Sequence, residues 1–163
     1  MQVALAKTER ADLIVHTGNL LNFPSFRAAY YVQQVLDDAA VPYMYTTGNH
    51  DWTWAEMAGA ASPNHFRKIY CWAEESTLSP LFLGREPANS SKLISGIWFV
   101  AIDNSTHYIL DEQLAFFQGT AEAAAEAGEP VVLLLHIPLF SSAMHVRRPV
   151  SPAQCETQPR LSV

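Results

Sequence analysis

Residues 42–51 read PYMYTTGNHD, an apolar run that stops at a glycine and continues into three polar side chains. Aromatic and β-branched residues are enriched in strands, so this run predicts a strand over residues 42–47. Residues 12–17 form an earlier short apolar run that ends at Gly18-Asn19, and residues 131–135 form a later one that ends at His136. Three predicted strands therefore pass directly into polar residues.

Helices are predicted between these strands. Ser25 is expected to cap a helix over residues 26–39, whose apolar residues recur at helical spacing. Pro63 suits the first position of a second helix. Asp111 is expected to cap a third helix that runs to about Gly128, and residues 2–10 resemble the end of another.

The remaining segments complete an alternating order of helices and strands. Residues 92–95 and 97–103 flank Gly96 and predict a hairpin that leads into a buried strand, after a loop-rich stretch over residues 74–91. Such alternation is typical of an α/β fold built on a mainly parallel or mixed sheet.

Composition excludes several classes of protein. The 163 residues are 49% hydrophobic and 16% charged, which is unlike a disordered chain or a coiled coil. The net charge is −6 and the basic residues form no stripe, so nucleic acid is not expected as a stable partner. No apolar run approaches the roughly 20 residues that span a bilayer. Cys71 and Cys155 lack the spacing of a disulfide framework or zinc finger.

The polar residues that follow the three strands predict a ligand site. In open α/β sheets, ligands bind outside the carboxyl ends of the strands, so these side chains should converge. Imidazole, amide and carboxylate groups are suitable ligands for Zn, Fe or Mn. The predicted site residues are Asn19, Asn49, His50, Asp51 and His136.

Each of these residues also has a purely structural interpretation. A Gly-Asn pair is most often a turn, and His136 or His50 alone could be a core or loop histidine. Their joint occurrence at three strand ends favours a site. Packing is as good an explanation as substrate contact for Trp52 and Trp54, and His16, His65 and His107 are interpreted as structural.

The order of these motifs resembles the calcineurin-like metallophosphoesterases. That family carries the motifs DxH, GD, GNH followed by D or E, a lone His, and GHxH on a βαβ-based sandwich of mixed sheets flanked by helices. Gly48-Asn49-His50-Asp51 matches the third motif and His136 the lone histidine. The resemblance implies a phosphoesterase domain over residues 1–140, followed by an irregular tail over residues 141–163.

The resemblance also implies roles for the metal-binding residues. Asn49 and His136 would bind one divalent ion through an amide oxygen and an imidazole nitrogen, and Asn19 stands where the family has a metal ligand. The intact family site holds two ions, which could be Mn, Fe or Zn. Such a pair would bind the phosphate of a small phosphorylated substrate and generate the attacking hydroxide.

Further roles follow for the residues beside the metals. His50 would protonate the leaving-group oxygen or stabilise the transition state, and Asp51 would orient His50. Asn22, in the loop after the first strand, would contact the substrate. The predicted function is metal-dependent hydrolysis of a phosphomonoester or phosphodiester.

The sequence departs from the family pattern in three places. It contains no DxH and no GHxH motif, so we expect a domain truncated at both ends. Asn19 replaces the aspartate whose carboxylate bridges both metals, and a neutral amide offsets less of the repulsion between two cations. We therefore expect this chain to be weakly active or inactive.

Two alternatives remain. The chain could be a non-catalytic binding module that keeps the phosphoesterase fold. A Rossmann-type nucleotide binder is disfavoured, because no GxGxxG follows any predicted strand.

Overall fold

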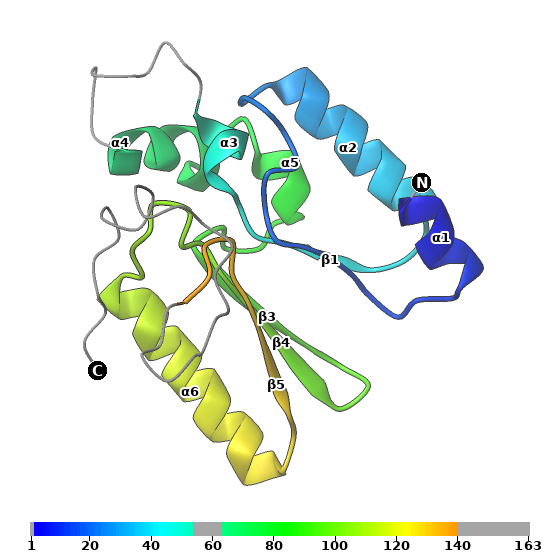
Figure 1. The fold of residues 1–163 in the computed structure, drawn as a ribbon, viewed down its shortest axis with the longest axis vertical. Helices are drawn as coiled ribbons and strands as arrows, with labels where there is room; N and C mark the ends of the chain where they lie inside the picture. The colour runs from blue at the N-terminus through cyan, green and yellow to red at the C-terminus, as the bar shows by residue number, and fades with distance from the viewer. Residues whose placement is uncertain (1, 54–62, 140–163) are drawn as a thin grey trace, which may run out of the picture.

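The computed structural model describes residues 2–53 and 63–139 of the chain. The order of helices and strands confirms the predicted α/β fold (Figure 1). The elements are α1 (Gln2–Thr8), β1 (Ile14–His16), α2 (Phe26–Asp38), β2 (Tyr43–Tyr45), α3 (Asn49–Trp52), α4 (Pro63–Arg67), the π-helix η2 (Lys68–Trp72), α5 (Ser79–Phe82), β3 (Asn89–Ile94), β4 (Ile97–Ile102), α6 (Asp111–Ala127) and β5 (Val131–Leu134).

The described strands form two sheets. β1 and β2 are parallel, with Val15 opposite Met44. In the second sheet, β4 pairs antiparallel with β3 and parallel with β5, so this sheet is mixed, as predicted. Helix α6 packs on β3 and β4, whereas α5 packs on α2 and β2 (Figure 1).

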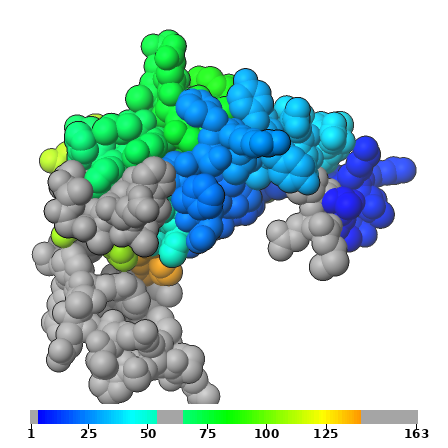
Figure 2. Space-filling view, turned by 90° about the horizontal axis from the view of Figure 1, so that it is seen from above, coloured from blue at the N-terminus to red at the C-terminus, as the bar shows by residue number. Residues whose placement is uncertain are grey.

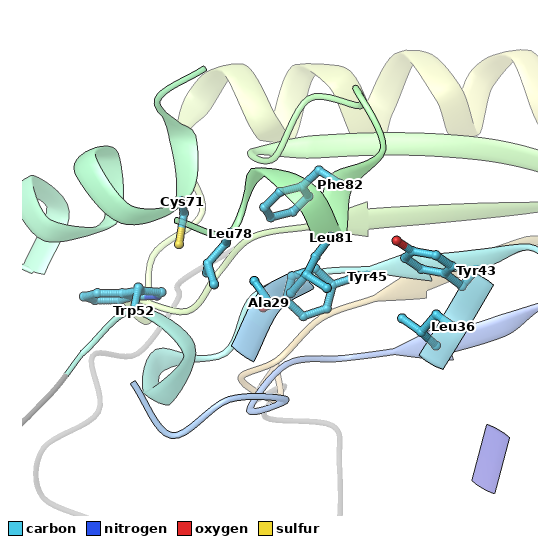
Figure 3. Close-up of a cluster of buried hydrophobic side chains, with 9 residues drawn as sticks. All are labelled: Ala29, Leu36, Tyr43, Tyr45, Trp52, Cys71, Leu78, Leu81 and Phe82. Atoms are coloured by element: carbon cyan, nitrogen blue, oxygen red, sulfur yellow. The ribbon is translucent and has the colours of Figure 1, made fainter. Parts of the chain in front are cut away.

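Strand β2 contributes to a separate core on each of its faces, because successive side chains point to opposite sides. Tyr43 and Tyr45 face a cluster that includes residues of α2, η2 and α5 (Figure 3). Met44 points the other way and packs with Ala101 of β4 and Leu134 of β5. This second cluster brings the two sheets together as a sandwich, so the ends of β2, β4 and β5 lie near one another.

Some helix boundaries agree with the sequence prediction and others do not. Ser25 caps α2, since its Oγ accepts a hydrogen bond from the Ala28 N–H. Asp111 is instead the first residue of α6, and the cap is Leu110, whose N–H donates to Gln113 Oε1 at 2.9 Å. The stretch predicted as loop over residues 74–91 contains α5 and the start of β3.

Two further predictions can be compared with the described residues. Cys71 is fully buried in η2 and is a free thiol within the described residues. Burial raises the pKa of this thiol well above its usual value. Within residues 2–53 and 63–139, the longest helices are too short or too polar to cross a bilayer. The predicted tail over residues 141–163 lies outside the described residues.

Candidate functional site

The loops after β1 and β2 approach each other at two glycines. A Cβ atom on Gly18 would lie 2.3 Å from Gly48 N, and one on Gly48 would lie 2.3 Å from Asn19 N. The same added atom on Gly48 would lie 2.8 Å from Cε1 of His136. All three strand ends predicted from the sequence therefore meet around Gly48, in a space that admits no side chain there.

The carboxylate of Asp51 joins the first two loops. It is fully buried and accepts hydrogen bonds from the N–H groups of Asn19 at 2.8 Å, Leu21 at 2.6 Å and Gly48 at 2.8 Å. Hydrogen bonds to a charged acceptor are stronger than neutral ones. Asp51 therefore fixes the turn after β1 against the start of α3. Its predicted role in orienting the His50 ring stays a prediction.

The buried charge of Asp51 also affects two neighbouring side chains. Burial raises the pKa of the Tyr45 hydroxyl well above its usual value, and the negative charge of Asp51 acts in the same direction. Burial lowers the pKa of His16, and Asp51 acts in the opposite direction. The ring of His16 lies 6.3 Å from that of Tyr45, within the body of the fold. The interpretation of His16 as a structural residue agrees with this position.

Asn19 and His50 are linked across the two loops. Asn19 has a left-handed backbone with φ of 56°, which asparagine adopts more readily than most residues. Its Oδ1 accepts a hydrogen bond from the His50 N–H at 3.1 Å. The His50 side chain is exposed at the edge of the sheet, where a substrate could reach it.

His136 lies against both loops. Its Nδ1 is 2.8 Å from the carbonyl oxygen of Thr17, and its Nε2 is 3.0 Å from Oδ1 of Asn49. A carbonyl can only accept, so Nδ1 carries the proton and Nε2 of the neutral ring presents a lone pair. Two acceptor atoms, Nε2 and the Asn49 oxygen, then face each other.

Such a pair fits a divalent cation. Metal-binding histidines usually donate their other ring N–H to a carbonyl or carboxylate, as His136 does toward Thr17. The fit is nevertheless partial, because a bound zinc ion usually has three or four protein ligands. Within the two described segments, no group of three or more His, Cys, Asp and Glu side chains could hold a metal ion. The amide oxygen of Asn19, the third predicted ligand, already accepts the His50 N–H.

Asn104, which follows β4, is a site residue that the sequence analysis missed. Its Oδ1 accepts the N–H groups of His136 and Ile137, both at 3.0 Å, and its Nδ2 donates to the Ile137 carbonyl at 2.7 Å. A sequence pattern could have indicated Asn104. Residues 103–106 are polar and follow an apolar strand, as the residues after β1 and β2 do. Nothing in the spacing indicated which loop Asn104 would contact.

Trp52 lies behind the site. Its side chain is buried and its Nε1 donates to Ser105 Oγ at 2.9 Å, so packing and hydrogen bonding account for this residue. The Ser105 hydroxyl in turn donates to the buried carboxylate of Asp103. Asp103 also accepts a hydrogen bond from Trp72 Nε1 at 2.8 Å. Trp54 lies outside the described residues.

The remaining predicted residues lie at the surface. Asn22 is exposed, one residue after the Leu21 amide that binds Asp51. In Figure 2 the blue surface of this loop and of the start of α2 lies beside the cyan surface around α3 and the orange surface that follows β5. His65 packs against the ring of Phe66 at 5.8 Å, and His107 is exposed in the loop after β4.

The comparisons with known proteins agree with this geometry. The family model described as calcineurin-like phosphoesterase matches residues 2–161. A solved structure titled as a dimetal phosphatase from Danio rerio has a similar fold, with a TM-score of 0.51 and 14% sequence identity over 85% of this chain. The chain spans 58% of that structure's length. No curated protein matches. The match of the family model over residues 2–161 establishes that the chain belongs to the calcineurin-like phosphoesterase family.

Proposed function

We propose that this chain is a metal-dependent phosphoester hydrolase for a small phosphorylated substrate, with a low rate of turnover. The observation that carries the proposal is the facing pair of acceptors, His136 Nε2 and Asn49 Oδ1, 3.0 Å apart. Two lone pairs at this distance repel unless a cation or a proton lies near both. Family membership makes a divalent metal the expected cation.

The residues around this pair would have different roles in the reaction. Asn49 and His136 would hold the ion, which would supply Lewis acidity. His50 is exposed beside them and protonates the leaving-group oxygen. Asp51 keeps the His50 segment against the Gly18-Asn19 turn through its hydrogen bonds to backbone amides.

Asn19 limits the rate in this proposal. A bridging aspartate would bring a negative charge between two cations, whereas the amide of Asn19 is neutral and its Oδ1 accepts the His50 N–H. We expect one ion to bind more tightly than a second, and the paired state to be poorly populated at micromolar metal.

The first test measures hydrolysis of chromogenic phosphomonoesters and phosphodiesters with added Mn²⁺. We expect slow turnover that depends on Mn²⁺ and falls at least 100-fold in His50→Gln, because general acid catalysis contributes about 10²–10⁴-fold. His107→Gln is the matched control, since His107 is also an exposed loop histidine. Turnover that His50→Gln leaves unchanged would contradict the role of His50, and fast turnover would contradict the limit set by Asn19.

A second test restores the missing charge. Asn19→Asp should raise turnover and Mn²⁺ affinity at least tenfold, because the carboxylate can bridge two ions. Gln34→Glu adds the same charge to an exposed position of α2 and should change neither quantity by more than about twofold. Equal effects of the two substitutions would mean that general electrostatic attraction, not a metal ligand, explains the gain.

A non-catalytic phosphate-binding module is the second candidate. The engagement of Asn19 Oδ1 by the His50 N–H favours it, since this bond completes the loop without any metal. Calorimetric titration separates the two candidates. Phosphate binding that is independent of Mn²⁺, with no hydrolysis in Asn19→Asp, would support the binding module.

A further inference from the structure

The end of β4 contacts both halves of the candidate site. Residues 103–106 are buried, although all four are polar. The side chain of Ser105 bonds Trp52 in α3, on the side of the loop that carries His50. The side chain of Asn104 bonds the loop after β5, which carries His136. One short segment is therefore joined to both loops.

Asn104 makes its bonds to the backbone of the His136 loop. Its amide accepts from two successive N–H groups and donates to a carbonyl of the same loop, all within 3.0 Å. The side chain is 97% buried, since only 3% of its surface is exposed, so water cannot easily replace these bonds. The three bonds fix the backbone on both sides of the His136–Ile137 peptide.

This backbone position decides what the His136 ring can reach. The ring contacts Thr17 O through Nδ1 and Asn49 Oδ1 through Nε2, and these two atoms belong to different loops of the other sheet. A shift of the His136 backbone by an ångström would break at least one of the two contacts, because both are already between 2.8 and 3.0 Å. No hydrogen bond from Asn104 reaches the ring itself among those in the described residues.

We propose that Asn104 is a positioning residue of the candidate site, which holds His136 so that Nδ1 donates to Thr17 and Nε2 faces Asn49. The proposal rests on the proposed function in one respect, namely that this pair of acceptors takes up a divalent cation. Loss of Asn104 would then release the His136 ring from its single tautomer and weaken cation binding, while the rest of the fold persists.

A matched control distinguishes positioning from general stability. Gln113 is fully buried and also makes three hydrogen bonds to backbone, namely with Leu110 N, Ala88 O and Asp103 O. It lies at the same end of β4 as Asn104, yet these bonds reach no residue of the His136 loop. Gln113→Leu should therefore reduce stability about as much as Asn104→Leu without changing the environment of His136.

The experiment compares the full chain with Asn104→Leu, Asn104→Asp and Gln113→Leu. Imidazole ¹⁵N NMR without metal reports the tautomer of His136, which follows from the hydrogen bond that each ring nitrogen makes. We expect the Nδ1–H tautomer in the parent and in Gln113→Leu, and a mixture of tautomers in Asn104→Leu. Asn104→Asp keeps an acceptor for both N–H groups but faces the Ile137 carbonyl without a donor, so it should be intermediate.

Mn²⁺ binding, followed by electron paramagnetic resonance, is the second measurement. Loss of a residue that orients a metal ligand typically weakens metal affinity about 10–100-fold, and we expect this loss in Asn104→Leu. Gln113→Leu should stay within about threefold of the parent. Far-UV circular dichroism identifies any variant that fails to fold, in which case Asn104→Asp takes the place of Asn104→Leu.

The outcomes separate this proposal from the proposed function. If the parent binds no Mn²⁺, the proposed function fails, and the NMR comparison alone decides the role of Asn104. If Asn104→Leu keeps the parent tautomer, or if Gln113→Leu disturbs His136 equally, Asn104 contributes only general stability and the proposal is overturned.

Discussion

The two halves of the candidate site are fixed by different buried side chains. The loops after β1 and β2 are joined by Asp51, a carboxylate that accepts three backbone N–H groups. The loop after β5 is joined to β4 by Asn104, an amide that accepts two N–H groups and donates to one carbonyl. The groups that face each side chain explain the difference. Only donors surround Asp51, whereas Asn104 also faces the Ile137 carbonyl, which a carboxylate would repel.

The strands that carry the two halves also differ. The Asp51 half comprises the loops after β1 and β2, and the Asn104 half comprises the loops after β4 and β5. The Asp51 half rests on β2, whose Tyr43 and Tyr45 are ionisable and buried. The Asn104 half rests on β4 and β5, whose sequences IWFVAI and VVLL contain no ionisable side chain. The comparison teaches that Asp51 contributes a buried charge to its half of the site, whereas Asn104 contributes uncharged hydrogen bonds. Four predictions test this difference, in order of decreasing effect.

Asp51→Asn is expected to have the largest effect. The substituted amide keeps one acceptor but turns its NH₂ group toward buried N–H donors, so at least one donor loses its partner. We expect the free energy of unfolding to fall by about 3 kcal/mol in urea denaturation. Asp111→Asn, at the exposed first position of α6, should change it by less than about 0.5 kcal/mol. Similar losses in the two variants would show that the charge of Asp51 is not required.

Gly48→Ala tests the contact between the two halves. The added Cβ would lie 2.3 Å from Asn19 N and 2.8 Å from His136 Cε1, so both loops must shift. We expect a loss of about 2 kcal/mol in the free energy of unfolding. Gly119→Ala in α6 is the control, because its Cβ meets nothing within 4 Å and should stabilise the helix by about 0.5–1 kcal/mol. Destabilisation by both variants would contradict the assignment of the loss to this contact.

Ser105→Ala removes the hydrogen bond that joins β4 to α3. Loss of the Ser105 partner leaves the buried Trp52 Nε1 without an acceptor, and we expect a cost of about 1 kcal/mol. Hydrogen exchange should show lower protection of the α3 amides, while the Ile137 amide keeps its protection because Asn104 is unchanged. If protection of the Ile137 amide decreased as much as that of the α3 amides, the two halves would open as one unit.

Alkaline pH should weaken the Asp51 half selectively. Burial raises the pKa of Tyr43 to about 12, against an ordinary value of 10.0, and raises that of Tyr45 well above its ordinary value. The folded state therefore resists ionisation, so this contribution to stability is complete below pH 10 and is lost as the pH rises toward 12. We expect the urea midpoint to fall less between pH 9 and 11 when Tyr43 and Tyr45 are both replaced by Phe. Tyr108→Phe, at an exposed tyrosine, should leave the pH dependence unchanged.

Local features of the fold could be predicted from the sequence. The Ser25 cap and the strand ends at Gly18 and Gly48 depend on neighbouring residues, so propensity and spacing indicate them. Helix α5 has four residues, which is little more than one helical turn, so no hydrophobic pattern can repeat within it. The cap of α6 was misplaced by one residue because Gln113, not Asp111, satisfies the Leu110 N–H.

The candidate site was predictable only in part. Its members follow strands, and the rule that strand ends converge identified Asn19, Asn49, His50, Asp51 and His136. The structure brings Asn49 to His136 and Asn19 to His50, while their catalytic and metal-binding roles stay predictions. Asn104 also follows a strand, but it was missed because its side chain bonds the backbone of the His136 loop, and neither spacing nor the strand-end rule indicates such a contact.

The close approach of Gly18 and Gly48 has an evolutionary consequence. Each glycine is required by the backbone of the opposite loop, since an added Cβ on either would lie 2.3 Å from a backbone nitrogen. Selection for folding alone would therefore preserve both glycines in a lineage that had lost turnover. Asn19 is restricted in a different way, because its backbone φ of 56° suits only residues that tolerate the left-handed conformation, such as asparagine and aspartate. The presence of both glycines therefore reports the fold and does not by itself report activity.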